Sequence, residues 1–236
     1  MPEINVEIQI EAKTLRASVN VPEEPVRPLD LLPIFQGFSS AVVDAASEGL
    51  PVTCRRGCSA CCRQIVPVSV TEAINLINVI DEMPPERKAI IMERFRDAKA
   101  KIEAAGLLTP FKPGKLTNMD VQRDVALRYF YLGLPCPFLE NDACSIYEDR
   151  PLSCREYLAV SPPPNCSDPA NVQVETLIMP KKLSFILYNF GDGVGNDGAK
   201  VIPLTLIFDY QFPEQPLVPG VEQFRNFFVA FKEQML

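Results

Sequence analysis

The chain has 236 residues, a formal net charge of −7, and 47% hydrophobic residues. This length supports one substantial core, so we expect a single domain over residues 1–236. The acidic balance argues against the positive surface typical of nucleic-acid binding. No apolar run reaches the ~18 residues that span a bilayer, and the first residues lack the pattern of a signal peptide. We therefore expect a cytoplasmic protein with neither a nucleic-acid nor a membrane partner.

Apolar and polar residues alternate at the start of the chain, which predicts a β-hairpin over residues 4–21. Residues 29–48 carry apolar side chains at helical spacing and are followed by Gly49, which predicts a helix that ends there. We assign the hairpin and this helix to an N-terminal region, residues 1–50.

Three more helices are predicted in the middle of the chain. Ser69 and Glu72 have the spacing of a capping box, so one helix begins there. Residues 86–105 carry an apolar stripe typical of an amphipathic helix, and residues 119–132 form the third. A loop-rich segment, 135–168, follows. The C-terminal extension, 170–236, closes on a helix whose phenylalanine stripe we interpret as core or a dimer contact: Phe224, Phe227, Phe228 and Phe231.

These patterns predict a mainly α fold (α+β), namely a single helical domain with an N-terminal β-hairpin and a loop-rich, cysteine-ligated metal centre. The 23 prolines, about twice the usual share, fit many loops and short elements. The run from Gly193 to Gly198 has the G-x-G-x-x-G spacing of dinucleotide sites. Pro203 would interrupt the helix that such a site requires, so we interpret this run as a surface turn.

The eight cysteines fall into two groups. Four lie within the nine-residue run CRRGCSACC at 54–62, and four are spread over residues 136–166. Thiols in a reducing cytosol stay free or bind metal, and spacings of two or three residues let thiolates converge on one centre. We therefore predict a metal-binding region over residues 54–166, with eight candidate ligands: Cys54, Cys58, Cys61, Cys62, Cys136, Cys144, Cys154 and Cys166.

The chain contains no histidine. A transition-metal site must therefore use thiolates, with or without a carboxylate, and thiolate-rich sites select zinc or iron–sulfur clusters. The absence of histidine also excludes Ser-His and Cys-His nucleophilic catalysis. The sequence names no catalytic residue and no site for an organic cofactor.

The two groups are expected to meet, with sulfur atoms of one within roughly 4 Å of the other, because ligands of one ion stand that close. The loops at 52–66 and 135–168 have few apolar anchors, so metal binding is expected to order them. Cys61 and Cys62 are adjacent, so one is expected to serve the main centre and the other a second centre or nearby packing. Cys166 is remote from the tight group and is expected to matter least; it fits a buried core cysteine equally well.

Arginines accompany the cysteines in the sequence. Arg150 and Arg155 fit three roles: they balance the negative charge of thiolates, support the turn at Asp149 to Pro151, or clamp an anionic substrate. Charge balance and turn support are the simpler interpretations.

The run CRRGCSACC, followed by CPFLENDACSIYEDRPLSCREY at 136–157, resembles the YkgJ-like cysteine-cluster family (CxxCxxCC) of zinc- or iron-chelating domains. The shared pattern is C-x3-C-x2-C-C, then Cys-x-Phe-Leu, then Cys-Ser-Ile-Tyr-Glu-x-Arg-Pro and Cys-Arg. It covers roughly residues 54–157, and the resemblance implies metal binding. The matching positions are the first seven cysteines with Tyr147, Arg150, Pro151 and Arg155.

The resemblance also implies one activity, because flagellin lysine methylase relatives of this family are understood to use an iron–sulfur cluster in methyl transfer. Radical-SAM enzymes hold a [4Fe–4S] cluster with the same C-x3-C-x2-C spacing, but consecutive helices over residues 70–132 do not fit their strand–helix repeats. We expect a metal-binding protein that holds zinc or iron, with a [4Fe–4S] cluster favoured over zinc. The alternatives are an iron–sulfur enzyme acting on a protein or small molecule, and a zinc-stabilised interaction module whose partner the sequence does not name.

Overall fold

The computed structural model describes residues 1–10, 13–111, 119–179, 182–190, 201–212 and 214–233. Helices dominate this part of the chain, and its named strands form two-stranded antiparallel pairs. The prediction of a mainly α fold with some β structure is therefore confirmed. The run from Gly193 to Gly198 lies outside the described residues. Within the described ranges, no helix is long and apolar enough to cross a membrane.

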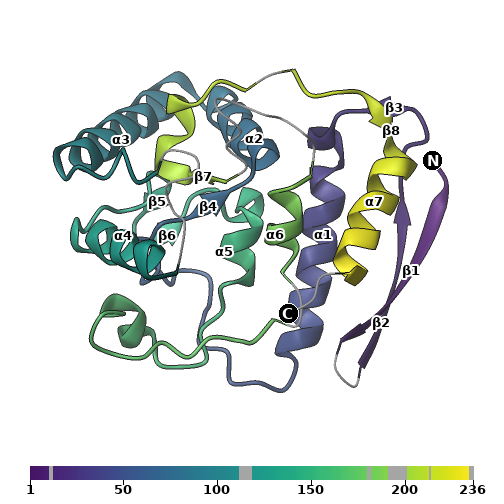
Figure 1. Cartoon of the computed structure of the whole chain (residues 1–236), viewed down its shortest axis with the longest axis horizontal. Coiled ribbons are helices and arrows are strands. Elements are labelled where there is room, and N and C mark those ends of the chain that lie inside the picture. Colours follow the sequence, from purple (N-terminus) through teal and green to yellow (C-terminus); the bar gives the residue numbers. More distant parts are fainter. Residues whose placement is uncertain (11–12, 112–118, 180–181, 191–200, 213, 234–236) are drawn as a thin grey trace.

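The N-terminal region contains the predicted hairpin and helix. Strands β1 (Glu3–Ile10) and β2 (Lys13–Asn20) pair antiparallel, and alternation turns Val6 and Ile8 of β1 into the core. Helix α1 (Pro28–Ser47) follows Arg27, whose backbone N–H donates to the Asp30 carboxylate at 2.9 Å. Figure 1 shows the hairpin at one side of the molecule, beyond α1 and the C-terminal helix α7.

The three central helices also lie where the sequence predicts them. They are α2 (Val70–Asp81), capped by the Ser69 hydroxyl, α3 (Pro85–Ala104) and α4 (Met119–Tyr131). The apolar stripe of α3 is buried throughout, as an amphipathic helix requires.

Short elements and one longer helix, α7, make up the rest of the described chain. The cysteine-bearing part contains β4 (Pro67–Val68), β5 (Leu139–Glu140), β6 (Ala143–Cys144), η1 (Tyr147–Asp149), α5 (Leu152–Glu156) and η2 (Pro163–Ser167). The C-terminal part contains α6 (Leu183–Leu187), β7 (Ile202–Pro203), η4 (Leu204–Asp209), β8 (Val218–Pro219) and α7 (Gly220–Glu233). Two of its strands pair with earlier ones, β8 with β3 (Pro25–Val26) and β7 with β4.

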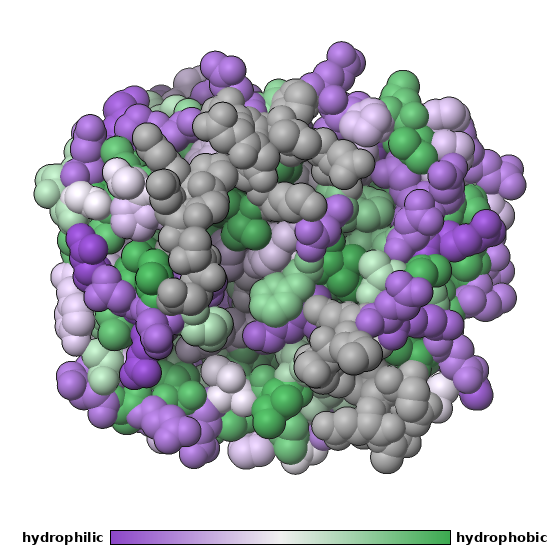
Figure 2. All heavy atoms as spheres, in the orientation of Figure 1, coloured by the Kyte–Doolittle hydropathy of each residue, from purple (hydrophilic) through white to green (hydrophobic). Residues whose placement is uncertain are grey.

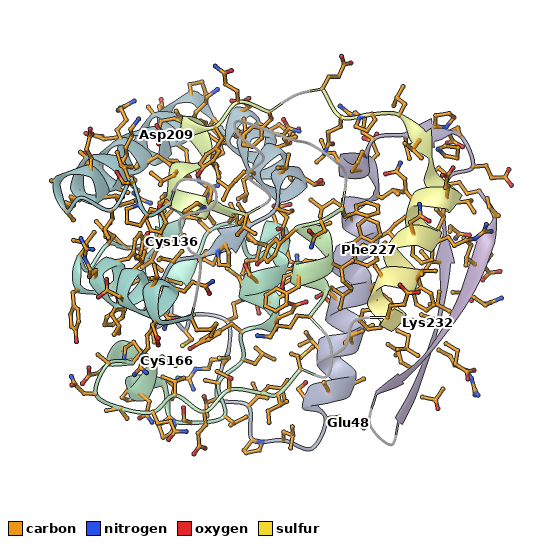
Figure 3. All side chains as sticks on the ribbon, viewed as in Figure 1. Glu48, Cys136, Cys166, Asp209, Phe227 and Lys232 are labelled. Atoms are coloured by element: carbon orange, nitrogen blue, oxygen red, sulfur yellow. The ribbon has the colours of Figure 1, made fainter. Side chains whose placement is uncertain are left out.

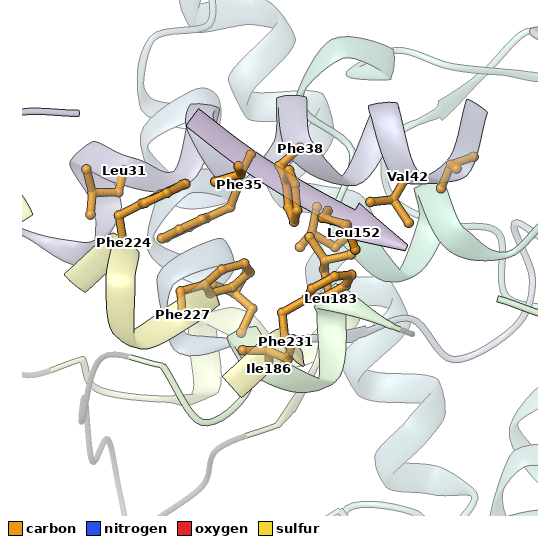
Figure 4. Packing of buried hydrophobic residues seen from close by; sticks show 14 of the residues in the cluster. Leu31, Phe35, Phe38, Val42, Leu152, Leu183, Ile186, Phe224, Phe227 and Phe231 are labelled. Carbon is orange, nitrogen blue, oxygen red and sulfur yellow. The ribbon is translucent and has the colours of Figure 1, made fainter. Parts of the chain in front are cut away.

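The C-terminal extension forms one core with the N-terminal region. Figure 4 shows phenylalanines of α1 and α7 facing one another. The rings of Phe35 and Phe227 stack with their centres 4.0 Å apart, and Phe38 meets Phe231 edge to face. Leu152, from the cysteine-bearing segment, is also fully buried in this cluster. Of the two interpretations of the phenylalanine stripe, the structure supports core packing.

A second hydrophobic cluster anchors the other part of the cysteine-bearing segment. Phe138 and Ile146 are buried there against α2, α3 and η4. The segment between residues 136 and 154 is therefore attached at one end to this second cluster and, through Leu152, to the first. This attachment corrects the expectation that the second loop has few apolar anchors.

Glu72 is a buried carboxyl group, 2% exposed, that joins α2 to the cysteine-bearing segment. Its Oε2 accepts hydrogen bonds from the backbone N–H (2.8 Å) and the hydroxyl (2.9 Å) of Ser69. Its Oε1 accepts a hydrogen bond from the backbone N–H of Leu152 at 2.7 Å. Burial raises the pKa of Glu72, and hydrogen bonds from these partners oppose the rise. Glu72 thus fixes the start of α5, the helix that carries Cys154.

We expect Glu72→Ala to lower the free energy of unfolding by at least about 2 kcal/mol, because two buried backbone N–H groups would lose their acceptor. The control is Glu82→Ala, since Glu82 is exposed at the other end of α2 and should change the value by less than ~0.5 kcal/mol. Urea unfolding of both variants measures the difference. Equal effects of the two substitutions would contradict a stabilising bridge from α2 to α5.

Candidate metal centre

The first cysteine group lies on a series of tight turns. The backbone N–H of Cys58 donates to the carbonyl of Arg55, and that of Cys62 donates to the carbonyl of Ser59, each at 3.0 Å. Gly57 has φ 89°, in the left-handed region that favours glycine. The C-x3-C and C-x2-C spacings therefore correspond to turns that repeatedly reverse the chain.

The second group is arranged by a small hairpin and a short helix. β5 and β6 pair with Leu139 opposite Cys144, and the turn between them places Asn141 and Asp142 at positive φ, as in a type I′ turn. This hairpin returns Cys144 toward Cys136. Helix α5 then carries Cys154.

The two groups meet, as the sequence predicts. The backbone N–H of Cys136 donates to the carbonyl of Cys62 at 2.7 Å, and the Ser59 hydroxyl donates to Asp142 at 3.2 Å, at the tip of the small hairpin. A cavity of about 250 Å³ lies at the junction. Six cysteines from both groups line it: Cys58, Cys61, Cys62, Cys136, Cys144 and Cys154.

The thiols around the cavity do not form a complete metal-binding site in this structure. Among the residues that the structure describes, no three Cys, Asp or Glu side chains are close enough together to hold one ion. The predicted separation of roughly 4 Å between sulfur atoms of the two groups stays a prediction, as does the ligand role of each cysteine.

Cys166 does not lie apart from the first group, so the expectation of its remoteness is wrong. The backbone N–H of Thr53 donates to the carbonyl of Ala159 at 2.9 Å, and the Thr53 hydroxyl donates to the carbonyl of Ser161 at 2.6 Å. These bonds fold the chain that leads to Cys166 back along the start of the first group. Burial, followed by the neighbouring thiols of Cys54 and others in the first group, raises the pKa of Cys166. Figure 3 shows Cys166, with Cys136, on the side of the molecule away from the β1–β2 hairpin.

Cys61 and Cys62 have their thiols side by side. A hydrogen bond with the Cys62 side chain, followed by burial, raises the pKa of Cys61. Both residues line the cavity. Cys61 also acts electrostatically on Cys54, Cys136 and other cysteines of both groups, so it stands between the two groups.

Burial is the main reason that three further cavity thiols, those of Cys136, Cys144 and Cys154, resist ionisation. It raises the pKa of Cys136 and Cys144, and raises that of Cys154 to about 12. Backbone N–H groups oppose the rise by hydrogen bonding to sulfur: Phe138 to Cys136, and Ile146 to Cys144. A third such bond runs from the Ala159 N–H to Cys54 Sγ at 3.1 Å.

The two arginines occupy different positions relative to the cavity. Arg150 lines the cavity, and its guanidinium opposes the pKa rise at four cysteines of both groups. The guanidinium carbon lies 3.7 Å from the centre of the Tyr147 ring, a cation–π contact. Arg155 instead donates from Nε to the carbonyl of Arg150 at 2.8 Å and from Nη1 to the Ser40 hydroxyl at 3.3 Å. Arg150 is thus placed to balance thiolate charge and also donates from Nε to the carbonyl of Tyr147 at 3.2 Å, whereas Arg155 contacts the turn and is not among the described residues that line the cavity.

The cavity extends beyond the thiols to residues that sequence reasoning missed. Glu156 is 4% exposed and accepts hydrogen bonds from the backbone N–H (3.1 Å) and hydroxyl (2.6 Å) of Ser184. Burial raises the pKa of Glu156 to about 7. Tyr157, Tyr188 and Phe185 line the same end, and Phe185 is 50% exposed. Figure 2 shows hydrophobic and hydrophilic residues intermixed on the face drawn there. Glu156 follows the Cys-Arg pair directly, but nothing in that pattern predicts a partner on α6.

Residues 53–177 match the family model CxxCxxCC, described as "Putative zinc- or iron-chelating domain". No curated protein and no solved structure matches the chain. The matched segment is more than half of the chain and contains both cysteine groups. The chain therefore belongs to the CxxCxxCC family of zinc- or iron-chelating domains.

Proposed function

We propose that this protein binds zinc or iron through the thiolates of its cysteines, and that an iron–sulfur cluster is the preferred form. The observation that carries the proposal is the gathering of six thiols, from two separate parts of the chain, around one cavity. Because the chain has no histidine, its available soft donors are the thiolates that select these metals. The positive charge of Arg150 beside the thiols suits a thiolate-bound centre, which is negative overall.

Three observations support iron–sulfur over zinc. They are the C-x3-C-x2-C spacing, the absence of histidine, and the resemblance to iron–sulfur methylase relatives. The N–H···S hydrogen bonds at three cysteines fit this preference, because such bonds help to set cluster potentials. They also suit zinc thiolates, so the test must distinguish the two metals.

Among the described residues, no three metal-binding side chains are close enough together to hold one ion. Metal binding therefore requires the thiols to turn toward a common centre. Rotation about χ1 and small shifts of the first loop are the changes that metal binding would bring about. The first loop is suited to such shifts, because the hydrophobic clusters of the described residues include none of residues 54–64.

A second candidate function is an iron–sulfur enzyme that modifies a protein or small molecule, with methyl transfer of the flagellin lysine methylase type as the specific case. The observation that favours it is the continuation of the cavity past the thiols to Glu156, Phe185 and Tyr188. A bound cluster with an open iron would supply electron transfer or direct contact with a substrate. A zinc-stabilised interaction module, by contrast, is expected to keep its metal in a closed four-thiolate site.

Removal of the metal should lower the melting temperature and increase protease cutting, most strongly within residues 54–64, because that loop has no anchor in the hydrophobic clusters. Cys58→Ala should have the same effect, whereas Ala60→Ser, in the same series of turns, leaves every thiol and the Ser59–Asp142 hydrogen bond in place. Thermal melts and limited proteolysis, before and after chelation, measure this effect. An unchanged melt of protein that has demonstrably lost its metal would contradict a structural role.

Protein purified without oxygen should be brown and contain iron and acid-labile sulfide. Cys54→Ser, Cys58→Ser and Cys61→Ser should each lower the visible absorbance, because a cubane cluster needs thiolate ligands on its irons. Absorption spectra with metal and sulfide analysis provide the measurement, and Ala60→Ser serves as control. Colourless protein with stoichiometric zinc and no sulfide would remove the iron–sulfur proposals and leave zinc binding.

A further inference from the structure

Two arginine side chains from separate parts of the chain lie over the ring of Tyr147. The guanidinium carbon of Arg150 stands 3.7 Å from the ring centre, and that of Arg56 stands 5.2 Å from it. Both distances are within the ~6 Å at which an aromatic face attracts a cation. Arg56 belongs to the first loop, between Cys54 and Cys58, whereas Tyr147 and Arg150 follow the β5–β6 hairpin. Tyr147 therefore joins the two cysteine-bearing parts without using a thiol.

The turn that carries Tyr147 is held from several sides. Arg150 Nε donates to the carbonyl of Tyr147 at 3.2 Å, and Arg155 Nε donates to the carbonyl of Arg150 at 2.8 Å. Ile146, just before the turn, is buried in the second hydrophobic cluster, and Leu152, just after it, is buried in the first. The Tyr147 ring is thus held in place, and it limits the positions that a long arginine side chain stacked on it can take.

Neither guanidinium on this ring is neutralised by a carboxylate within the part of the chain that the structure describes, since its ion pairs include neither Arg56 nor Arg150. Tyr147 and Arg150 both line the cavity that six cysteines border. Four thiolates on a divalent ion carry a net charge of about −2. Positive charge at the edge of this cavity is therefore available to a metal centre rather than to a neighbouring acidic residue.

We propose that Tyr147 is a positioning residue of the metal centre, and that its ring holds one guanidinium from each cysteine-bearing part at the edge of the cavity. The inference rests on the proposed metal binding and extends it to a side chain that binds no metal. Metal loss requires the thiolates to regain protons, and positive charge nearby favours their ionised form. The contact with Arg56 has a second effect, because it keeps the first loop against the hairpin segment. Tyr147 thus slows the loss of metal.

The test measures how fast metal passes from protein purified without oxygen to an excess of a coloured chelator. Tyr147→Leu should lose metal about threefold to tenfold faster than wild type, the range expected when cation–π contacts are removed. Tyr147→Phe keeps the ring and should match wild type. Arg150→Leu and Arg56→Leu should each lose metal faster as well, and Arg56 is exposed, so its replacement should leave the fold intact.

A double variant and a matched arginine control show whether the ring acts through the guanidinium groups. Tyr147→Leu with Arg150→Leu should accelerate metal loss by less than the product of the two single effects, because both changes remove one contact. Arg63 follows Cys62 directly, yet it is absent from the described cation–π contacts and from the described lining of the cavity. Arg63→Leu removes the same charge and should stay within about twofold of wild type.

The reduction potential provides a readout that a purely structural ring would not move. In protein that carries an iron–sulfur cluster, Tyr147→Leu and Arg150→Leu should each make the potential more negative, because the reduced cluster carries more negative charge and loses a nearby cation. Tyr147→Phe should leave the potential unchanged. In protein that carries zinc, the rates of metal loss decide alone.

The outcomes separate this inference from the proposed function. Wild-type rates in Tyr147→Leu, an equal acceleration by Arg63→Leu, or Tyr147→Phe as fast as Tyr147→Leu would overturn the role of the ring while metal binding stands. If Tyr147→Leu does not fold, wild-type rates in both Arg56→Leu and Arg150→Leu would overturn it. Protein that holds neither zinc nor iron would overturn both proposals.

Discussion

The crowding of thiols around one partly buried cavity is the constraint on which the rest of the structure depends. Burial raises the pKa of most of these thiols, so they keep their protons unless another positive charge takes the place of the proton. Arg150 supplies part of that charge, held by its contact with the Tyr147 ring. A metal supplies far more, because it replaces the proton at every sulfur that it binds. These thiols are therefore neutral without metal, and a bound cation that replaces their protons would make the ionised form of each sulfur the favoured one.

The two cysteine groups differ in how they are attached to the hydrophobic clusters. The second group is attached to two hydrophobic clusters, through Phe138 and Ile146 on one side and Leu152 on the other, and Glu72 fixes the start of α5. The first group has turns and hydrogen bonds but no side chain in these clusters. One part of the site is thus held in place while the other part can adjust. Metal binding would then order the first loop against the second cysteine group, which is already held in place.

Sequence patterns predict the regular elements well, because alternation, the apolar stripe of α3 and the Ser69–Glu72 capping box are local properties of the chain. The dense run at 54–62 likewise predicts that metal ligands gather there. The position of Cys166 could not be predicted, since it depends on bonds from Thr53 to Ala159 and Ser161, which are distant in sequence. The two-residue strand pairs β3–β8 and β4–β7 leave no recognisable pattern for the same reason.

The size and extent of the cavity help to distinguish a purely structural metal site from a site that also binds a ligand. A metal that only holds loops together is best enclosed on all sides, as in closed four-thiolate sites. Here six cysteines border a space of about 250 Å³ that continues to Tyr157, Phe185 and Tyr188. This space exceeds the volume of a single ion, and its far end offers aromatic surface and a buried carboxyl group, that of Glu156, with both oxygens held by Ser184. A metal held by these cysteines would therefore stand at the edge of a space large enough to admit a ligand.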